Sequence, residues 1–263
     1  MFKDDRKDFE AKWEDIKVFI EYGMLTQDKF ADKMDKCYLV QDTDGNFYTV
    51  EEVKAKVEAL QKDKNEKVIL LYTHNTEEHH SFISQAKKRG YTVLVMDSPL
   101  TSHMLMKLEQ RNDGVSFTRV DSDTLDKLID KGEEMVSKLS KEQEEALKPL
   151  VEGLVDKKKY QVELSALSSD DAPMVITQSE FMRRMMEQQQ SGGGGMMMGA
   201  FPEMYNLVVN SNHPLIAQIS EEKEEVKQKA LTEQALDLAM LSQGMLKGER
   251  LTGFINRSLE LIK

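Results

Sequence analysis

Cysteine is almost absent from this sequence of 263 residues, in which Cys37 is the only one. A single thiol excludes an intramolecular disulfide framework and any zinc site built from clustered cysteines. No stretch approaches the roughly 20 consecutive apolar residues of a membrane-spanning helix. Residues 3–6, Lys-Asp-Asp-Arg, are charged where a secretory signal peptide would turn apolar. These absences predict a cytoplasmic protein with no membrane partner.

Basic charge is also in deficit, with 36 Lys and Arg against 47 Asp and Glu, a net charge of −11 and a pI near 5.1. An acidic chain lacks the concentrated basic face that contacts phosphates, so we expect no nucleic-acid partner. Charged residues make up 32% and apolar residues 40% of the chain, which is typical of much solvated helix surface. The length allows one large domain or two ordinary ones.

The N-terminal segment has the pattern of an amphipathic helix. Apolar residues recur at spacings of three and four and share one predicted helix face: Phe9, Trp13, Ile16, Phe19 and Ile20. We expect this helix to end at Gly23. Further along, Asp44-Gly45 lies between two apolar runs and indicates a turn, either in a hairpin or in a loop.

The clearest predicted unit is a strand, a helix and a second strand. Residues 68–72 are a continuous apolar run, typical of a strand covered on both faces. Thr76 can begin a helix that runs to Arg89 and ends at Gly90, and residues 92–96 form another buried strand. The short return makes this a βαβ unit with a locally parallel sheet. The predicted class is therefore α/β, with a small three-layer domain first.

The second half of the chain predicts a further mixed α/β domain, and we place the boundary near residue 131. Its expected strands cover residues 160–164, 174–176 and 205–209. Thr177-Gln-Ser-Glu180 has the pattern of a capping box that opens a helix. The chain then ends in a helical hairpin, with one helix over about residues 222–247 and another after Thr252.

The terminal hairpin is apolar almost all round between Ala235 and Leu246. Such a helix needs apolar partners on two sides, and one side is its own domain. We therefore expect a homodimer in which two hairpins form a four-helix bundle. The alternative is that the hairpin only closes its own domain. The predicted interface consists of Leu238, Leu241, Met245, Leu251, Phe254, Ile255 and Leu259.

The sequence offers few candidates for catalytic residues. His74, His79, His80 and His103 lie near the βαβ unit, where α/β proteins often place ligands. The turn after the first strand has no glycine-rich phosphate cradle, and adjacent His79 and His80 point to different helix faces. We interpret these histidines as solvated surface residues. The alternative is an α/β enzyme that uses His74 and Asp97 at the parallel strand ends.

Methionine is the unusual component, with 17 in the chain and eight between Met174 and Met204. On the helix after Thr177, four residues form an apolar patch: Phe181, Met182, Met185 and Met186. A glycine run, Gly192–Gly195, and Met196–Met198 follow. Core packing is one interpretation, since methionine fills irregular gaps. We favour a surface that binds varied partners, because no single helix face can bury three consecutive methionines and this side chain adapts to many shapes.

Several stretches, taken in order, resemble the ninety-kilodalton heat-shock chaperone family in its bacterial form. They are residues 9–23 with their Tyr-Gly ending, residues 67–74 (Lys-Val-Ile-Leu-Leu-Tyr-Thr-His), residues 90–97 (Gly-Tyr-Thr-Val-Leu-Val-Met-Asp), residues 210–216 (Asn-Ser-Asn-His-Pro-Leu-Ile) and residues 234–239. The resemblance extends from about Asp4 to Lys263. It implies that residues 1–130 are the distal part of the family's middle domain and residues 131–263 its dimerisation and client-contact domain.

The resemblance implies a homodimeric molecular chaperone whose partners are unfolded or partly folded client proteins, with the seventy-kilodalton chaperone system as a further partner. The helix over residues 177–190 is implied to contact clients, best through Met182 and Met186. A second client surface is implied on the helix after the second βαβ strand. Its residues here are Ser102, His103, Met104 and Met106, where Ser102 and His103 replace the family's acidic and aromatic pair.

In the family, the ATPase domain precedes the part that this chain resembles. We therefore expect no catalytic, cofactor or metal site in this chain, no bound ATP or magnesium, and no enzyme activity. Without ATP the chain would hold clients passively. The structural alternative is a dimerisation scaffold of a larger chaperone, in which the methionine patch packs onto the chaperone's own domains.

Overall fold

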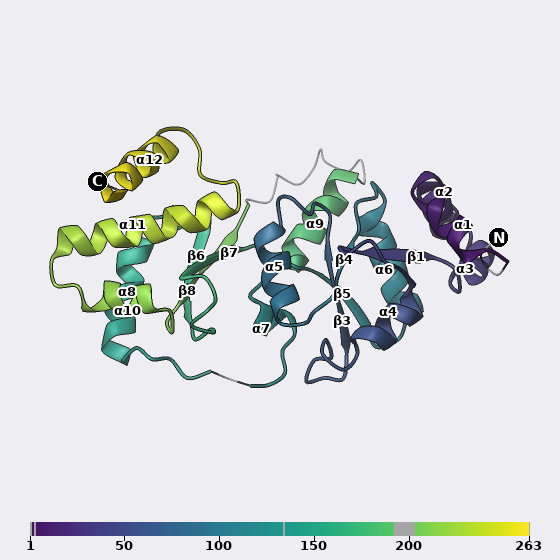
Figure 1. The fold of residues 1–263 in the computed structure, drawn as a ribbon, viewed down its shortest axis with the longest axis horizontal. Helices are drawn as coiled ribbons and strands as arrows, with labels where there is room; N and C mark the ends of the chain where they lie inside the picture. The colour runs from purple at the N-terminus through teal and green to yellow at the C-terminus, as the bar shows by residue number, and fades with distance from the viewer. Residues whose placement is uncertain (1, 3, 134, 192–202, 263) are drawn as a thin grey trace. The chain divides into compact units, whose positions relative to one another are not determined.

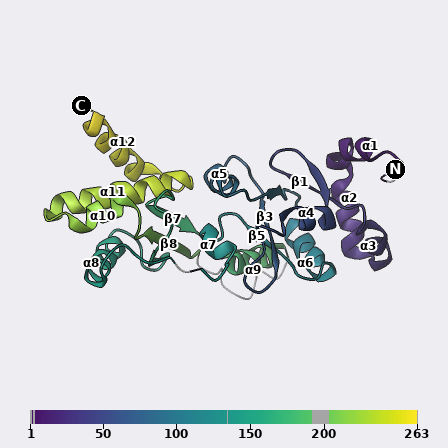
Figure 2. The same ribbon diagram turned by 60° about the horizontal axis from the view of Figure 1, so that its bottom comes forward.

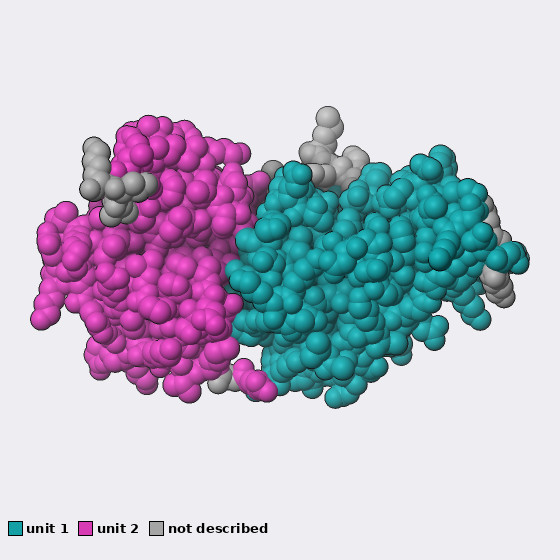
Figure 3. Space-filling view, in the orientation of Figure 1, with its two compact units in different colours: residues 1–132, 184–194 teal, residues 133–183, 195–263 magenta. Residues whose placement is uncertain are grey.

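The structure, a computed structural model, describes residues 2, 4–133, 135–191 and 203–262 (Figure 1). It divides the chain into two compact units, coloured separately in Figure 3. Unit 1 consists of Met1–Gly132 and Arg184–Gly194, and unit 2 of Glu133–Arg183 and Gly195–Lys263. Within the described ranges there are two mixed sheets and twelve helices. The predicted α/β class is confirmed.

Unit 1 is built on a five-stranded sheet of order β2-β1-β4-β3-β5. The strands β3, β4 and β5 are parallel, and β1 pairs antiparallel with both β2 and β4. Gly45, at φ +86°, makes the turn between β1 and β2, so the Asp44-Gly45 signal marks a hairpin. The strands are β1 (Leu39–Asp42), β2 (Phe47–Thr49), β3 (Val68–Thr73), β4 (Val93–Val95) and β5 (Val115–Arg119).

Helices cover both faces of this sheet. Every residue of β3 is buried, and alternate side chains of a strand point to opposite faces. Val68, Leu70 and Tyr72 join the core formed by α4 (Val50–Val57) and α6 (Thr101–Arg111). The other face is covered by α5 and α7, and Figure 2 shows α5 and α6 on opposite sides of the sheet. The helix α5 spans His80–Lys88, and α7 spans Leu125–Leu128.

The N-terminal segment forms two helices rather than the single one predicted. The first, α1 (Arg6–Ala11), ends at Lys12, and α2 runs over Trp13–Thr26. Within α2 the side chain of Phe19 is 78% exposed instead of lying in the core, because it lies about 120° around the helix from the buried Trp13. The prediction that Gly23 ends the helix was wrong as well. This glycine lies inside α2, where the ring of Phe30 in α3 (Asp28–Met34) packs against it.

Unit 2 has a three-stranded sheet of order β6-β8-β7, in which β8 pairs parallel with β6 and antiparallel with β7. Its strands are β6 (Tyr160–Ser165), β7 (Met174–Thr177) and β8 (Tyr205–Asn210). Apolar residues of the sheet pack with those of three helices in one core. The helices are α8 (Lys141–Glu152), α10 (Pro214–Glu221) and α11 (Glu225–Ser242).

Three helix boundaries differ from the sequence expectation. The helix α9 (Glu180–Ser191) begins at Glu180, because Thr177 is paired in β7 and cannot serve as its cap. The helix α11 ends at Ser242, where Gly244 takes φ +63° and the Met245 N–H donates to the Met240 carbonyl at 2.9 Å. The last helix, α12 (Gly248–Ile262), begins before Thr252. None of the described helices is long and apolar enough to cross a membrane.

Candidate functional site

The helix α9 separates apolar from polar side chains on two faces. Successive helix positions differ by about 100°, so its four apolar residues share an arc of about 140°. The charged residues occupy the opposite arc. We call the apolar set the α9 patch: Phe181, Met182, Met185 and Met186. The predicted continuation of this surface, Gly192–Gly195 and Met196–Met198, lies outside the described residues.

The polar face of α9 is held by ion pairs and hydrogen bonds. In unit 1, Arg184 donates to the Glu109 carboxylate of α6 at 2.9 Å and to the Phe117 carbonyl of β5 at 2.6 Å. Glu187, one turn further, accepts a hydrogen bond from Ser102 of α6. In unit 2, Arg183 donates to the Glu180 carboxylate at 2.6 Å. These contacts fix the rotation of the helix about its axis.

That rotation decides which α9 side chains reach solvent. Phe181 is 71% exposed, whereas Met182, Met185 and Met186 are half-buried. A phenylalanine exposed to this extent leaves apolar surface in water that a bound apolar group could cover. The α9 patch therefore combines one rigid exposed ring with three adaptable thioether side chains, which suits contact with varied apolar partners.

The second predicted client surface, on α6, is only partly accessible to solvent. Met104 is fully buried in the core of unit 1, because the face of α6 that carries it packs on the sheet. Ser102, His103 and Met106 are half-buried, and Ser102 is engaged with Glu187. The sequence could not show this, since the spacing of Met104, Leu105 and Leu108 fits a buried face and an exposed one equally well.

The helices α11 and α12 expose several of the predicted interface residues. Leu238 and Leu241 on α11 are 45% and 43% exposed, and Ile255 and Leu259 on α12 are 48% and 54% exposed. The remaining three, Met245, Leu251 and Phe254, are half-buried at the edge of the unit 2 core.

A buried carboxylate joins these two helices. Asp237 of α11 is 1% exposed and accepts hydrogen bonds from both Arg250 and Arg257 of α12. An ionised carboxylate that is taken out of water needs such partners. The clamp therefore holds α12 against α11, with the exposed leucines and isoleucine left on the outside.

The histidines do not all behave as the solvated residues that the sequence predicted. His79 is only 5% exposed, and burial lowers its pKa to about 4. His74 lies in the loop after β3 with its Nε2 3.7 Å from the Glu78 carboxylate. Asp97 instead pairs with Lys17 at 2.7 Å. The alternative enzyme pair, His74 and Asp97, is thus engaged with separate partners.

The comparisons with known proteins all give one family. A family model described as "Hsp90 protein" matches residues 1–262. A protein named "Chaperone protein HtpG" from Bacteroides thetaiotaomicron is 36% identical over 329 residues, covering 100% of this chain and 48% of the relative. One of that name from Porphyromonas gingivalis strain W83 is 38% identical over 244 residues, covering 92% of this chain and 36% of the relative. The chain thus spans at most about half the length of the curated relatives it matches.

These matches overturn the prediction that the chain is not an enzyme and has neither ATP nor magnesium as a cofactor. That prediction assumed a chain restricted to a part of the family that lacks the ATPase. The family model instead matches from residue 1 to residue 262 without restriction to such a part, as do the relatives that cover the whole chain. The exclusion of the family's ATP chemistry is therefore withdrawn.

Proposed function

This chain belongs to the HSP90 family, and from that premise we propose that it acts in a molecular chaperone by binding non-native polypeptides on the α9 patch. The observation that carries this proposal is Phe181, 71% exposed, on a helix whose polar face is fixed by Arg184 and Glu109. A non-native polypeptide exposes the apolar side chains that such a patch can cover. The relatives are named as chaperones, which supports the same activity.

The size of the patch predicts weak binding that does not depend on one client sequence. An apolar surface on the order of 400 Å² yields roughly 10 kcal/mol of gross burial free energy. Loss of translational freedom and ordering of side chains consume much of it. The methionines can change rotamer to fit different clients at low cost. The chaperone therefore holds many clients loosely rather than one tightly.

We further propose a homodimer formed through α11 and α12, with residues 131–263 as the family's dimerisation domain and residues 1–130 as the distal part of its middle domain. Four side chains with exposed fractions of 43–54% support this assembly: Leu238, Leu241, Ile255 and Leu259. Two copies of the hairpin would cover these side chains in a four-helix bundle. We also propose a cytoplasmic location, which rests on the family to which the chain belongs.

The experiment that tests client binding is a fluorescence-anisotropy titration of a labelled, reduced and carboxymethylated α-lactalbumin with the chain. Phe181→Ser should weaken the apparent Kd about tenfold, because burying a phenylalanine ring is worth ~1.5–3 kcal/mol. The matched control is Val226→Ser, an equally exposed apolar residue at 77% on α11, which should leave the Kd unchanged.

Two results would count against the proposal. If the wild-type chain shows no saturable binding, the scaffold alternative, in which the α9 patch docks onto the chaperone's own domains, is favoured. If Phe181→Ser and Val226→Ser weaken binding equally, binding does not depend on the α9 patch. Circular dichroism of both variants confirms that each one is folded before the titrations are compared.

A further inference from the structure

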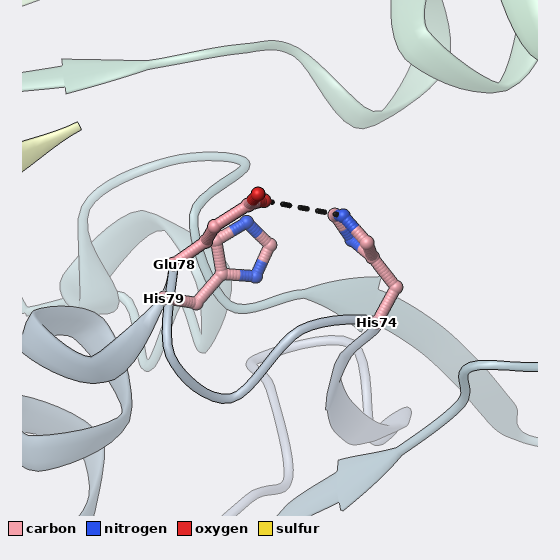
Figure 4. Close-up of side chains that lie close together, drawn as sticks. All are labelled: His74, Glu78 and His79. Atoms are coloured by element: carbon pink, nitrogen blue, oxygen red, sulfur yellow. Dashed lines mark ion pairs between the residues drawn. The ribbon is translucent and has the colours of Figure 1, made fainter. Parts of the chain in front are cut away.

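The loop that joins β3 to α5 in unit 1 brings three potential metal ligands together. His74 and Glu78 are exposed, His79 is buried, and one ligand atom of each lies within 4.8 Å of the others. Figure 4 shows the three side chains turned toward one another, with an ion pair between His74 and Glu78. The two imidazole rings are 4.8 Å apart and nearly perpendicular. The chaperone function proposed above uses none of these groups.

Hydrogen bonds hold His79 in an orientation that suits a metal ligand. Its Nδ1 is 2.8 Å from the Thr73 hydroxyl, and that hydroxyl donates to the Asn75 carbonyl at 2.9 Å. With its proton directed to Asn75, the Thr73 oxygen accepts the Nδ1–H of His79, so Nε2 carries the lone pair. A metal-binding histidine is typically fixed in this way by a hydrogen bond from its other ring nitrogen.

A carboxylate faces this lone pair. The Nε2 of His79 is 3.4 Å from Oδ2 of Asp121, and Asp121 is itself held by the Arg119 guanidinium at 2.7 Å. A metal ion bound at Nε2 lies near this carboxylate, whose negative charge attracts a cation.

We propose that His74, Glu78 and His79 bind a divalent transition-metal ion, with Zn²⁺ as the expected ion and Asp121 as a charged neighbour that does not coordinate. Two imidazoles and one carboxylate are a typical zinc ligand set, whereas Mg²⁺ and Ca²⁺ prefer oxygen ligands alone. Ligand atoms of a tetrahedral zinc site lie roughly 3.3 Å apart. The exposed side chains of His74 and Glu78 close the remaining gap by changing rotamer. Three protein ligands leave the fourth position to water.

The test is isothermal titration of the full chain with Zn²⁺. The wild-type chain should bind one ion per chain, and His74→Ala and Glu78→Gln should each weaken the apparent Kd by at least about tenfold. Both residues are exposed, so these variants should fold. The matched control is His80→Ala, which removes the exposed histidine next along the chain and should leave the Kd unchanged. His79→Ala is avoided because it opens a hole in the buried Thr73 and Asp121 environment.

Imidazole NMR signals provide a second readout on the same samples. The chain has five histidines, and Zn²⁺ should move the ring signals of His74 and His79 while those of His80, His103 and His213 stay in place. The proposal is overturned if the wild-type chain shows no saturable uptake of Zn²⁺. It is overturned equally if His80→Ala weakens uptake as much as His74→Ala, or if the His79 signals do not respond.

Discussion

Glu21 of α2 is a buried carboxyl group in unit 1. It is 2% exposed and accepts hydrogen bonds from the Tyr38 hydroxyl at 2.9 Å and from the Ser98 hydroxyl. Burial raises its pKa more than these hydrogen bonds lower it. The neutral carboxyl is thus favoured by folding, and the stability that it contributes is present at low pH and lost as the pH rises through the raised pKa.

Replacing Glu21 by Gln removes this titration. The amide oxygen can accept from Tyr38 and the amide nitrogen can donate to Ser98, so the hydrogen bonds survive. We expect the free energy of unfolding of Glu21→Gln to increase relative to that of the wild type as the pH rises from about 4 to 7, because only the wild type loses stability over this range. Urea unfolding at several pH values measures it. The control is Glu145→Gln, at an exposed position of α8, and a difference for Glu21→Gln that stays constant with pH would contradict the assignment.

For some residues, the sequence alone did not predict whether the side chain is buried or exposed. A periodic apolar pattern marks which residues share a helix face, but Phe19 at the edge of that face is exposed while Trp13 is buried. The burial of His79 depends on Asp121 and Arg119, more than 35 residues away in the chain. The sequence places adjacent His79 and His80 on different faces of a predicted helix. The pair that does approach, His74 and His79, has a spacing of five and requires the non-helical turn before α5.

At the scale of the element, the junction of α2 and α3 depends on the absence of one side chain. A Cβ built on Gly23 would lie 2.7 Å from the Phe30 ring, a distance that real side chains do not adopt. Gly253 in α12 is a matched contrast, because its Cβ would meet only the flexible end of Arg257 at 3.5 Å. Both glycines lie inside helices, but we expect substitution by alanine to change the free energy of unfolding in opposite directions at the two positions.

Gly23→Ala should lower the free energy of unfolding by ~1–3 kcal/mol, since the ring of Phe30 must move. Gly253→Ala should raise it by ~0.5–1 kcal/mol, because alanine is the better helix former and the space is free. Thermal and urea unfolding of both variants measure these changes. An unchanged or raised stability in Gly23→Ala would show that Phe30 does not hold α3 against α2.

Strands were more predictable than helix ends. The continuous apolar run of β3 and the Asp44-Gly45 turn are local signals, and both elements form at those positions. The end of α11 is instead set by Gly244, whose backbone lies in the left-handed region. Apolar residues continue beyond this glycine, so the sequence pattern predicted a longer helix. The start of α9 was misplaced because Thr177 is used by β7, a pairing that only the fold reveals.

At the scale of the whole molecule, the chain passes from unit 2 to unit 1 within α9. The composition changes near residue 131, but nothing in the sequence marks Arg184, where the second passage occurs. Arg184 belongs to unit 1 through Glu109 and Phe117, which are more than 65 residues away in the chain. Contacts between distant residues of this kind cannot be inferred from the pattern of one helix.

Assembly of the whole molecule gives a prediction for α11 and α12. Sedimentation velocity should show a dimer, and Leu238→Glu should shift it to monomer at micromolar concentration, because a charge in an apolar interface is costly. The control Val226→Glu places the same charge at an exposed position of the same helix and should leave the dimer intact. A wild-type chain that sediments as a monomer at every concentration would contradict the proposed bundle.

The central claim, that non-native polypeptides bind on α9, is tested most directly by site-specific photocrosslinking. A photoreactive benzoylphenylalanine replaces Phe181 in one sample and Val226 in another, both exposed apolar positions, and each is irradiated with reduced, carboxymethylated α-lactalbumin. The account predicts a strong crosslink from position 181 that unlabelled client competes away, and little from position 226. Equal yields at the two positions, or no crosslink at position 181, would contradict it.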